Sequence, residues 1–285
     1  MIFTAKELLL KAKEGGYAVG AFNTSDLEIT KGILEAAQEL NSPIIIETSE
    51  GEANFEGYRV FVSSVRDMAE DLGVDTAINL DHGKSFESVK YAIESGYSSV
   101  HIDCSTLPKE ENIAVTKQVV EFAHSRNVSV EGEFGHVGGS SEVHTGEQPK
   151  EDIVLTDPAE AIDYIKKTGV DIFAGSYGNI HGVYKNPPHL DIARIKQVAY
   201  GSGIPLSLHG GSGIPDDQIK ASIQAGICKI NVNTEIRKAY REALDKVLRN
   251  KVAEIVPYKY MPEAISAVKE VVKQKIVLFK AQSDS

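Results

Sequence analysis

Three of the eight histidines are each followed directly by glycine, and each lies at or just after a predicted β-strand. They are His82, His181 and His209. A single histidine at a strand end is more often a hydrogen-bonded core or rim residue than a metal ligand. Three imidazoles that converge on one face, however, form a catalytic type of zinc site, with a fourth position open to water or substrate. The pattern therefore predicts a metal site if the fold brings these strand ends together.

Two glycine-rich or polar turns supply a second kind of chemistry. GGSG (210–213) follows one predicted strand, and NVNT (231–234) ends the next strand and opens a helix. Backbone N–H groups at such turns and at helix N-termini bind phosphate, and the loops after strands seven and eight are the usual phosphate site of an α/β barrel. We therefore expect a phosphate-binding site beside His209.

The elements that must position these groups recur as strand–helix units. Short apolar strand patterns alternate with segments whose apolar residues recur three and four apart, which is typical of a parallel sheet covered by helices. Ser85 and the pair Asp157-Pro158 provide helix-capping chemistry. Eight such units predict an α/β fold, a (β/α)₈ TIM barrel formed as a single domain over residues 1–285. The predicted strands are 18–23, 43–49, 76–83, 98–105, 129–135, 171–178, 205–211 and 227–234.

Two segments depart from this regular alternation. The polar, glycine-rich stretch 136–156 follows the fifth strand, and loops of this length are commonly lids or binding loops. Two helical patterns at 234–249 and 261–280 extend beyond the barrel as a C-terminal helical extension. We expect this extension to serve in packing or in oligomer contacts.

Composition excludes several classes of protein. The formal net charge of −11 and the lack of a basic cluster argue against nucleic-acid binding. The longest apolar runs are too short to span a bilayer, and the charged N-terminus lacks the apolar core of a signal peptide, so we expect a cytoplasmic protein without membrane association. Cys104 and Cys228 lie in apolar strand patterns and are expected to be buried thiols.

Further polar residues stand at the predicted strand ends, where a barrel carries its functional groups. His101 alternates with Asp103 and is expected to point the same way, deeper in the barrel, as a buried and satisfied histidine. His124, His144 and His189 are expected on surface helices or loops. The other polar residues at these ends include Asn23, Ser49, Asp81, Ser105, Glu133 and Asn231.

Six motifs of the chain resemble one known family. They are NLDHG (79–83), IDCS (102–105), EGEFGHVGG (131–139), NIHGVYK (179–185), LHGGSGIP (208–215) and GICKINVNTE (226–235). In sequence, order and spacing they look like the class II ketose-bisphosphate aldolases, the zinc enzymes that act on fructose or tagatose 1,6-bisphosphate. The resemblance covers essentially the whole chain, and LHGGSG and GICKIN are highly specific to that family.

The resemblance implies a zinc-dependent lyase of carbohydrate metabolism that reversibly cleaves a ketose 1,6-bisphosphate to dihydroxyacetone phosphate and glyceraldehyde 3-phosphate. His82, His181 and His209 would bind Zn²⁺, and Asp81 would exchange a proton with the C4 hydroxyl. Cleavage leaves an enediolate, which a cation beside its oxygens stabilises. Glu133 and Asp103 match carboxylates near the metal, where a displaced zinc can rest.

The resemblance also implies the substrate contacts and the partners. A monovalent cation (Na⁺ or K⁺) would bind beside the phosphate, Lys185 could reach that phosphate, and the chain would form a homo-oligomer, a dimer or a tetramer. The strand-end residues Asn23 and Ser49 are further candidates for substrate binding. The positions that match the dihydroxyacetone phosphate site are Gly182, Gly210, Gly211, Ser212, Asn231, Val232, Asn233 and Thr234.

Three positions depart from the family pattern. The loop position that usually carries the acidic group for proton transfer at C3 is Ser141, with Glu142 one residue later as the candidate base. Tyr258 stands where the family places an arginine for the distal phosphate, and Glu52 replaces a small residue. Loss of a bidentate arginine and gain of carboxylates weaken phosphate binding. We therefore hypothesise an alternative in which the aldehyde partner carries no phosphate, so that the substrate is a ketose 1-phosphate.

Other functions stay open on the residues alone. A zinc hydrolase on the same barrel usually carries an H-x-H pair on its first strand, which AVGAFN lacks. A Schiff-base aldolase needs a desolvated lysine, and Lys229 is the only candidate, with a structural role favoured for it. A non-catalytic barrel subunit would be expected to lack the histidines or Asp81. The residues do not distinguish a fructose from a tagatose substrate, and three imidazoles also accept cobalt or iron.

Overall fold

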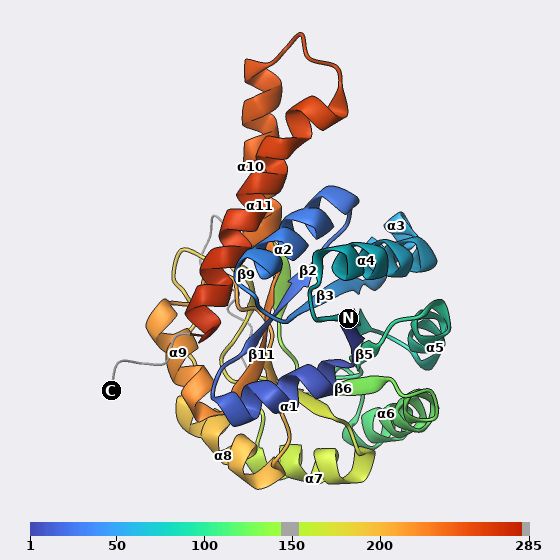
Figure 1. The fold of residues 1–285 in the computed structure, drawn as a ribbon. Coiled ribbons are helices and arrows are strands. Elements are labelled where there is room, and N and C mark those ends of the chain that lie inside the picture. The colour runs from blue at the N-terminus through green and yellow to red at the C-terminus, as the bar shows by residue number, and fades with distance from the viewer. Residues whose placement is uncertain (144–153, 281–285) are drawn as a thin grey trace.

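The computed structural model describes residues 1–143 and 154–280. In this part of the chain, eight parallel strands form a closed barrel, in the order β4-β3-β2-β11-β10-β8-β6-β5, and β5 pairs with β4 to complete the ring (Figure 1). The predicted (β/α)₈ TIM barrel is therefore confirmed. The barrel strands are β2 (Val19–Asn23), β3 (Ile44–Ser49), β4 (Thr76–Gly83), β5 (Ser99–Ile102), β6 (Ser129–Phe134), β8 (Ile172–Gly175), β10 (Leu206–Leu208) and β11 (Ile227–Val232).

Helices cover the outside of the barrel, and the expected caps begin two of them. Ser85 accepts a hydrogen bond at the start of α5, and Asp157 does so at the start of α7, with Pro158 as the first helical residue. These caps occupy backbone N–H groups that have no partner within the helix. The surrounding helices are α2 (Leu27–Glu39), α3 (Glu50–Glu56), α4 (Tyr58–Leu72), α5 (Phe86–Ser95), α6 (Lys109–His124), α7 (Pro158–Thr168), α8 (Ile192–Ser202) and α9 (Asp216–Ala225).

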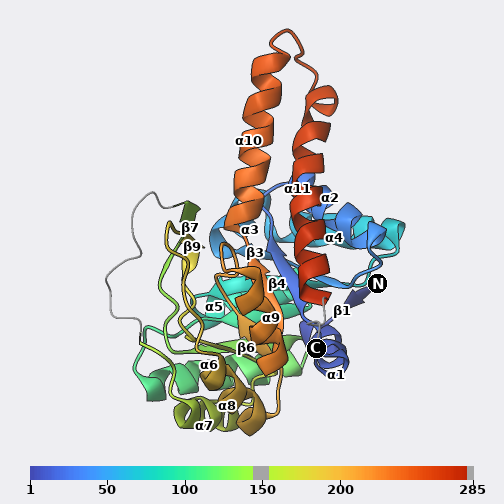
Figure 2. The same ribbon diagram turned by 90° about the vertical axis from the view of Figure 1, so that its left-hand side faces the viewer.

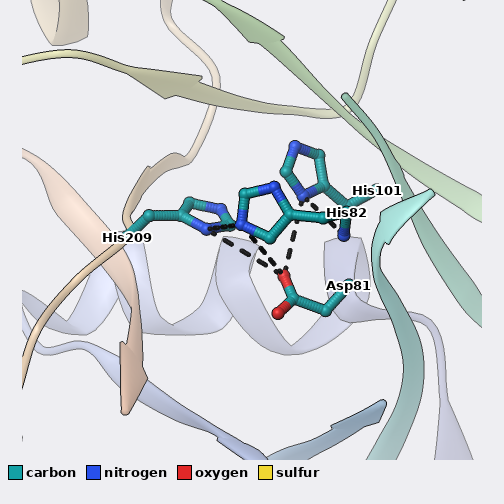
Figure 3. Close-up of side chains that lie close together, drawn as sticks. All are labelled: Asp81, His82, His101 and His209. Carbon is teal, nitrogen blue, oxygen red and sulfur yellow. Dashed lines mark hydrogen bonds and ion pairs between the residues drawn. The ribbon is translucent and has the colours of Figure 1, made fainter. Parts of the chain in front are cut away.

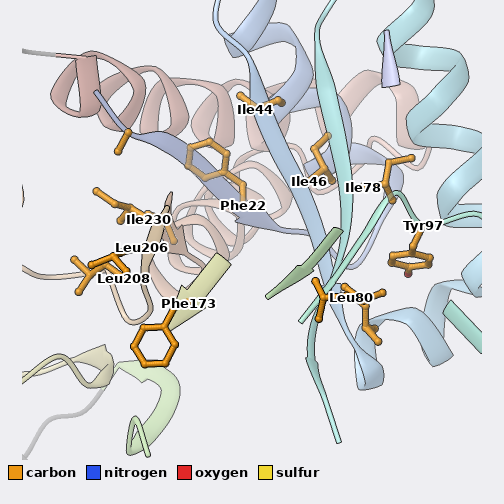
Figure 4. Close-up of a cluster of buried hydrophobic side chains, with 14 of the residues drawn as sticks. Phe22, Ile44, Ile46, Ile78, Leu80, Tyr97, Phe173, Leu206, Leu208 and Ile230 are labelled. Carbon is orange, nitrogen blue, oxygen red and sulfur yellow. The ribbon is translucent and has the colours of Figure 1, made fainter. Parts of the chain in front are cut away.

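Successive strand residues alternate between the two sides of the barrel wall. On β3, Ile44 and Ile46 point outward and pack in the main core between the strands and the helices (Figure 4). Ile45 belongs instead to a second cluster, inside the barrel. This alternation follows from the two-residue repeat of a strand, and it explains why buried strands read as nearly continuous apolar runs.

The N-terminal end of the barrel is closed by a segment that the strand pattern did not predict. β1 (Ile2–Phe3) pairs with β4, and α1 (Ala5–Gly15) places its apolar side chains against the inner cluster. Cys228 belongs to that cluster and Cys104 to the main core, and both thiols are buried as predicted. The floor of the barrel is therefore apolar.

The C-terminal extension forms two helices that lie side by side and project beyond the barrel (Figures 1 and 2). α10 spans Thr234–Asn250 and α11 spans Pro257–Lys280, so α11 begins four residues before the predicted segment. Val268, Val272 and Ile276 anchor α11 in the main core, where it packs beside α2. Among the described residues, no helix is both long enough and apolar enough to cross a membrane.

The segment 136–156, expected as an irregular loop, contains a short strand. β7 (Gly139–Val143) pairs in parallel with β9 (His181–Val183), which follows β8. This pairing joins segments about 40 residues apart and has no local periodic signal. The remainder of the predicted loop, 144–153 with His144, lies outside the described residues.

Candidate active site

The three predicted metal-binding histidines converge at the C-terminal ends of the barrel strands. His82 comes from β4, His181 from β9, and His209 directly follows β10. The ring centroid of His82 lies 5.1 Å from that of His181 and 4.7 Å from that of His209, and the His181 and His209 centroids are 6.0 Å apart. Figure 3 shows His82 and His209 with Asp81 and a fourth ring, His101. The three rings therefore lie together at this end of the barrel, and their role as metal ligands stays a prediction.

A local irregularity of β4 lets two neighbouring residues face the same site. Side chains of adjacent strand residues normally point to opposite faces. The β4–β5 register shifts between Leu80 and Gly83, and His82 has a left-handed backbone with φ of 53°. This conformation is costly for a residue with a side chain and is typical of functional sites. It brings the His82 ring to the side of the wall that Asp81 faces.

Carboxylates fix the proton positions of two of these rings. Nδ1 of His82 lies 2.8 Å from Oδ2 of Asp103, and Nε2 of His209 lies 2.7 Å from Oε1 of Glu131. Since an ionised carboxylate only accepts, both of these ring nitrogens carry the proton. The other two nitrogens, Nε2 of His82 and Nδ1 of His209, face each other at 3.1 Å, and in the neutral rings each carries a lone pair. Burial lowers the pKa of His82, but Asp81, Asp103 and Glu133 outweigh it and raise this pKa, so a proton can lie between the two nitrogens when no metal is bound.

This arrangement fits a divalent metal ion. Two lone pairs at 3.1 Å repel unless a cation or a proton lies between them. Two nitrogens bound to one tetrahedral zinc at 2.0–2.1 Å would lie about 3.3 Å apart. Histidine ligands that donate their second N–H to a carboxylate are the usual arrangement around zinc. The His82–His209 pair therefore has a spacing close to that of two zinc ligands. One group of potential ligand atoms that lie close together belongs to Asp81, His82, His101 and His209, and His181 lies outside this group.

His181 lies beside this pair as a neutral ring, and its role as the third metal ligand stays a prediction. Burial, together with the neighbouring His82 and His209, lowers the pKa of His181 to about 4. Its Nδ1 lies 3.3 Å from the carbonyl oxygen of Gly138, and the β7–β9 pairing holds this segment in place. A metal ligand must be unprotonated, so the lowered pKa of His181 suits that role.

Asp81 is buried between two amides. Asn23 Nδ2 donates to Oδ2 of Asp81 at 3.0 Å, and Asn231 Nδ2 lies 3.4 Å from Oδ1. Burial raises the pKa of Asp81, but His82, His101 and His209 outweigh it and hold this pKa well below its usual range. The carboxylate is therefore ionised and able to accept a proton.

Comparisons with known proteins agree with this geometry. The family described as "Fructose-bisphosphate aldolase class-II" matches residues 3–284. The chain belongs to the class II fructose-bisphosphate aldolase family. A fructose-bisphosphate aldolase of Staphylococcus aureus is 44% identical over 281 residues, which cover 98% of this chain and 97% of the relative. That of Geobacillus stearothermophilus is 43% identical over 278 residues, 96% of each chain. The crystal structure of the YdjI aldolase from Escherichia coli K12 is 32% identical, covers 99% of both chains and gives a TM-score of 0.86.

Most of the substrate positions predicted for a class II aldolase line one pocket with the histidines. Gly211 and Val232 are buried in the adjoining backbone, where the Gly211 N–H donates to the Asn231 carbonyl at 2.9 Å. The lining residues are Asn23, Asp81, His82, His181, Gly182, His209, Gly210, Ser212, Asn231, Asn233 and Thr234.

Ser49, Lys185 and Glu142 are further predicted residues that lie outside this pocket lining. Ser49 accepts from Glu52 N and donates to the Glu52 carboxylate, so its hydroxyl caps α3. Lys185 is exposed beyond β9. Glu142 is exposed on β7, on the strand that pairs with the one carrying His181. Their substrate and catalytic roles stay predictions.

The two predicted metal-binding carboxylates surround His82 on its far side. Oδ2 of Asp103 also binds Lys84 Nζ, and Oδ1 accepts from Ser105. Oε2 of Glu133 is buried without a hydrogen-bond partner among the described residues, 3.9 Å from Nδ1 of His82. His82, Asp103 and Glu133 thus form a second group of potential ligands. Direct ligation by these carboxylates stays a prediction.

His101 and three charged residues below the histidines complete the polar layer of the barrel interior. His101 is fully buried, as predicted, and its Nδ1 accepts from the backbone N–H of His82 at 3.2 Å. The prediction of a satisfied ring is wrong for Nε2, which has no hydrogen-bond partner among the described residues and lies 3.5 Å from Oε2 of Glu133. Lys229 forms ion pairs with Glu131 and Glu47, so the two carboxylates outweigh burial and raise its pKa. A protonated amine cannot form a Schiff base, which disfavours that alternative. Glu47 and Glu131 were not among the site residues predicted from the sequence. Glu131 could have been found from its position two residues before Glu133 on β6, because alternate strand residues point to the same side of the barrel wall.

Proposed function

We propose that this protein catalyses the reversible, metal-dependent cleavage of a ketose 1,6-bisphosphate to dihydroxyacetone phosphate and glyceraldehyde 3-phosphate. The observation that carries the proposal is the pair of facing ring nitrogens, Nε2 of His82 and Nδ1 of His209, beside the ionised Asp81. His181 supplies the third imidazole. Membership of the class II aldolase family supports the same activity.

Each group has a distinct role in this reaction. Zinc bound by the three imidazoles would supply a Lewis acid for the negative charge that develops as the C3–C4 bond breaks. Asp81 accepts the proton of the C4 hydroxyl during cleavage and returns it during condensation. Asn23 and Asn231 hold its two oxygens in position.

The proposed phosphate site lies at the N-terminus of α10 and in the turn after β10. Asn233 and Thr234 begin the helix, and Gly210 and Ser212 face them across the pocket. Gly210 has φ of 65°, and a Cβ there would lie 2.4 Å from the Ile180 carbonyl oxygen, so only glycine fits. Free backbone N–H groups at this helix start would bind the phosphate of the three-carbon fragment.

Several further features belong to the same proposal. We expect a Na⁺ or K⁺ ion beside the phosphate, and Glu142 as the group that transfers the proton at C3. We also expect a homo-oligomer, a cytoplasmic location and a single barrel domain over residues 1–285. The projecting helices α10 and α11 would supply contacts between copies (Figure 2).

Product release from a panel of sugar phosphates tests the proposal. We expect dihydroxyacetone phosphate from fructose or tagatose 1,6-bisphosphate, complete loss of activity with a chelator, and recovery with zinc. Borohydride in the presence of substrate should leave the protein unmodified. Undiminished cleavage after complete metal removal would exclude the mechanism, and covalent trapping would replace it with Schiff-base chemistry at a lysine.

One observation favours a second candidate, a ketose 1-phosphate substrate. Nη2 of Arg237 is paired with one oxygen of Glu52, and the other oxygen of Glu52 lies 3.3 Å from Asn23 Nδ2, so this arginine is already held by a carboxylate. Tyr258 is 76% exposed near the start of α11, so the family arginine has no substitute there. In this case kcat/KM for fructose 1-phosphate would equal or exceed that for fructose 1,6-bisphosphate. A strong preference for fructose 1,6-bisphosphate would exclude the ketose 1-phosphate as the substrate and would leave the ketose 1,6-bisphosphate.

A further inference from the structure

Lys229 lies inside the barrel below the three histidines, in a place where a charged side chain is unusual. It projects from β11 and is fully buried, as are Glu47 on β3 and Glu131 on β6. Its ammonium group lies 2.8 Å from Oε2 of Glu131 and 3.4 Å from Oε2 of Glu47. One cation therefore bridges carboxylates from two separated strands.

The first carboxylate connects Lys229 to a predicted metal ligand. Glu131 uses Oε2 for Lys229 and Oε1 for the Nε2–H of His209, at 2.7 Å. Occupation of both oxygens fixes the rotation of this carboxylate. His209 is thereby held as the tautomer that presents its lone pair at Nδ1, toward His82.

The second carboxylate connects Lys229 to the proton-transfer group. Oε1 of Glu47 accepts from Asn231 Nδ2, and Oε2 accepts from Asn79 Nδ2 at 2.9 Å. The Asn231 amide nitrogen in turn lies 3.4 Å from Oδ1 of Asp81. Rotation of Glu47 would therefore release the amide that holds Asp81.

We propose that Lys229 is a positioning residue that orients the metal ligand His209 through Glu131 and the proton-transfer residue Asp81 through Glu47 and Asn231. This inference rests on the proposed aldolase function and adds a residue that touches neither metal nor substrate. Burial of the Lys229–Glu131 ion pair, with Glu47 beside it, costs free energy that an apolar core would avoid. The contacts of Lys229 explain why a buried lysine is present, because one connects it through Glu131 to His209 and the other connects it through Glu47 and Asn231 to Asp81.

Two isosteric substitutions test separately the connection of Lys229 to His209 and its connection to Asp81. In Glu131→Gln, the amide oxygen faces Lys229 and the NH₂ group faces His209, which forces the proton of His209 onto Nδ1. We expect zinc affinity, measured by competition with a chromophoric chelator, to fall about 10- to 100-fold. The donors to the Glu47 carboxylate are Asn79, Asn231 and Lys229, and in Glu47→Gln at least one of them loses its acceptor. We expect kcat at saturating zinc to fall about 10-fold or more, with KM and zinc affinity within about 3-fold of the parent values.

Lys229→Met removes the shared cation, and we expect it to reduce both zinc affinity and kcat by at least about 10-fold. Lys6→Met is the matched control, because Lys6 pairs with the buried Asp171 near the N-terminal end of β8, away from the pocket. It should change thermal stability alone. All assays are made below the melting temperature of each variant.

The outcomes separate this inference from the proposed function. If the parent protein neither binds zinc nor cleaves a sugar phosphate, the proposed function is wrong. If the parent does both, and if folded Lys229→Met, Glu131→Gln and Glu47→Gln keep parental zinc affinity and kcat, Lys229 has only a structural role. If Lys229→Met fails to fold, the two glutamine variants decide: loss of zinc affinity in the first and of kcat in the second supports the inference, and parental values in both overturn it.

Discussion

Nε2 of His82 lies 3.1 Å from Nδ1 of His209, and each ring donates its other N–H to a carboxylate. Two acceptor nitrogens in such contact need a cation or a proton between them. The carboxylates of Asp103 and Glu131 each hold one of these rings in place. Metal binding therefore depends on these two residues as well as on the histidines that they orient.

Removal of the Asp103 carboxylate should weaken metal binding. In Asp103→Ala, Nδ1 of His82 loses its acceptor, and the ring can rotate or change tautomer. We expect zinc affinity to fall about 10- to 100-fold in chelator competition. Lys84→Met is the control, since Lys84 binds the same oxygen of Asp103 but does not contact His82 directly. Equal affinities for Asp103→Ala and the parent would contradict the orienting role of Asp103.

Substitution of Asp81 should separate chemistry from metal binding. Asp81→Asn keeps the shape of the side chain but cannot accept the C4 hydroxyl proton. We expect kcat to fall about 10²- to 10⁴-fold, with zinc content of the purified protein unchanged. If steady-state assays show this variant to be as active as the parent, another group transfers the proton.

The turn beside His209 should tolerate no side chain. Gly210 and Gly16 have similar backbone angles, with φ of 65° and 67°, but a Cβ at Gly210 would lie 2.4 Å from a carbonyl oxygen, whereas none lies within 4 Å at Gly16. The backbone term alone costs about 1–2 kcal/mol. We therefore expect this loss for Gly16→Ala in urea denaturation, and for Gly210→Ala a greater loss together with weaker zinc binding. Similar unfolding free energies for both variants would show that the turn can relax.

Glu56 should make the stability of the fold depend on pH. Burial, with Asp26 and Glu52 nearby, raises the pKa of Glu56 from 4.5 to about 7, and neither oxygen has a hydrogen-bond partner among the described residues. The folded state therefore binds the proton more tightly than the unfolded state. The free energy of unfolding should decrease as pH rises from 4.5 to 7 through this group.

Glu56→Gln should remove that decrease. Relative to the parent, it should be more stable by about 1 kcal/mol at pH 8, a value reduced for solvent screening of a half-buried group, and nearly equal at pH 4.5. Urea denaturation at the two pH values measures the difference. Glu121→Gln, at an exposed position of α6, is the control. A constant difference across pH would contradict the ionisation of Glu56 as the cause.

The sequence predicted the barrel and its strand ends because both depend on local patterns. Apolar runs and capping residues such as Ser85 and Asp157 identify elements one at a time, and parallel strands in a barrel bring their C-terminal ends together. The convergence of His82, His181 and His209 follows from that rule. The same alternation predicted that His101 lies deeper in the barrel, where it is fully buried.

Other features depend on contacts that no local pattern records. The β7–β9 pairing joins residues on either side of α7 and β8. The left-handed backbone of His82 arises where the β4–β5 register shifts. Lys229, Glu47 and Glu131 become a network only when strands from three parts of the barrel enclose them.

An anomalous difference map from a crystal grown with zinc, collected at the zinc absorption edge, tests the central claim most directly. The account predicts one strong peak about 2.0–2.1 Å from Nε2 of His82, from Nδ1 of His209 and from a ring nitrogen of His181. A map with no peak between these three rings, or with zinc bound only elsewhere, would contradict the metal site and the aldolase mechanism built on it.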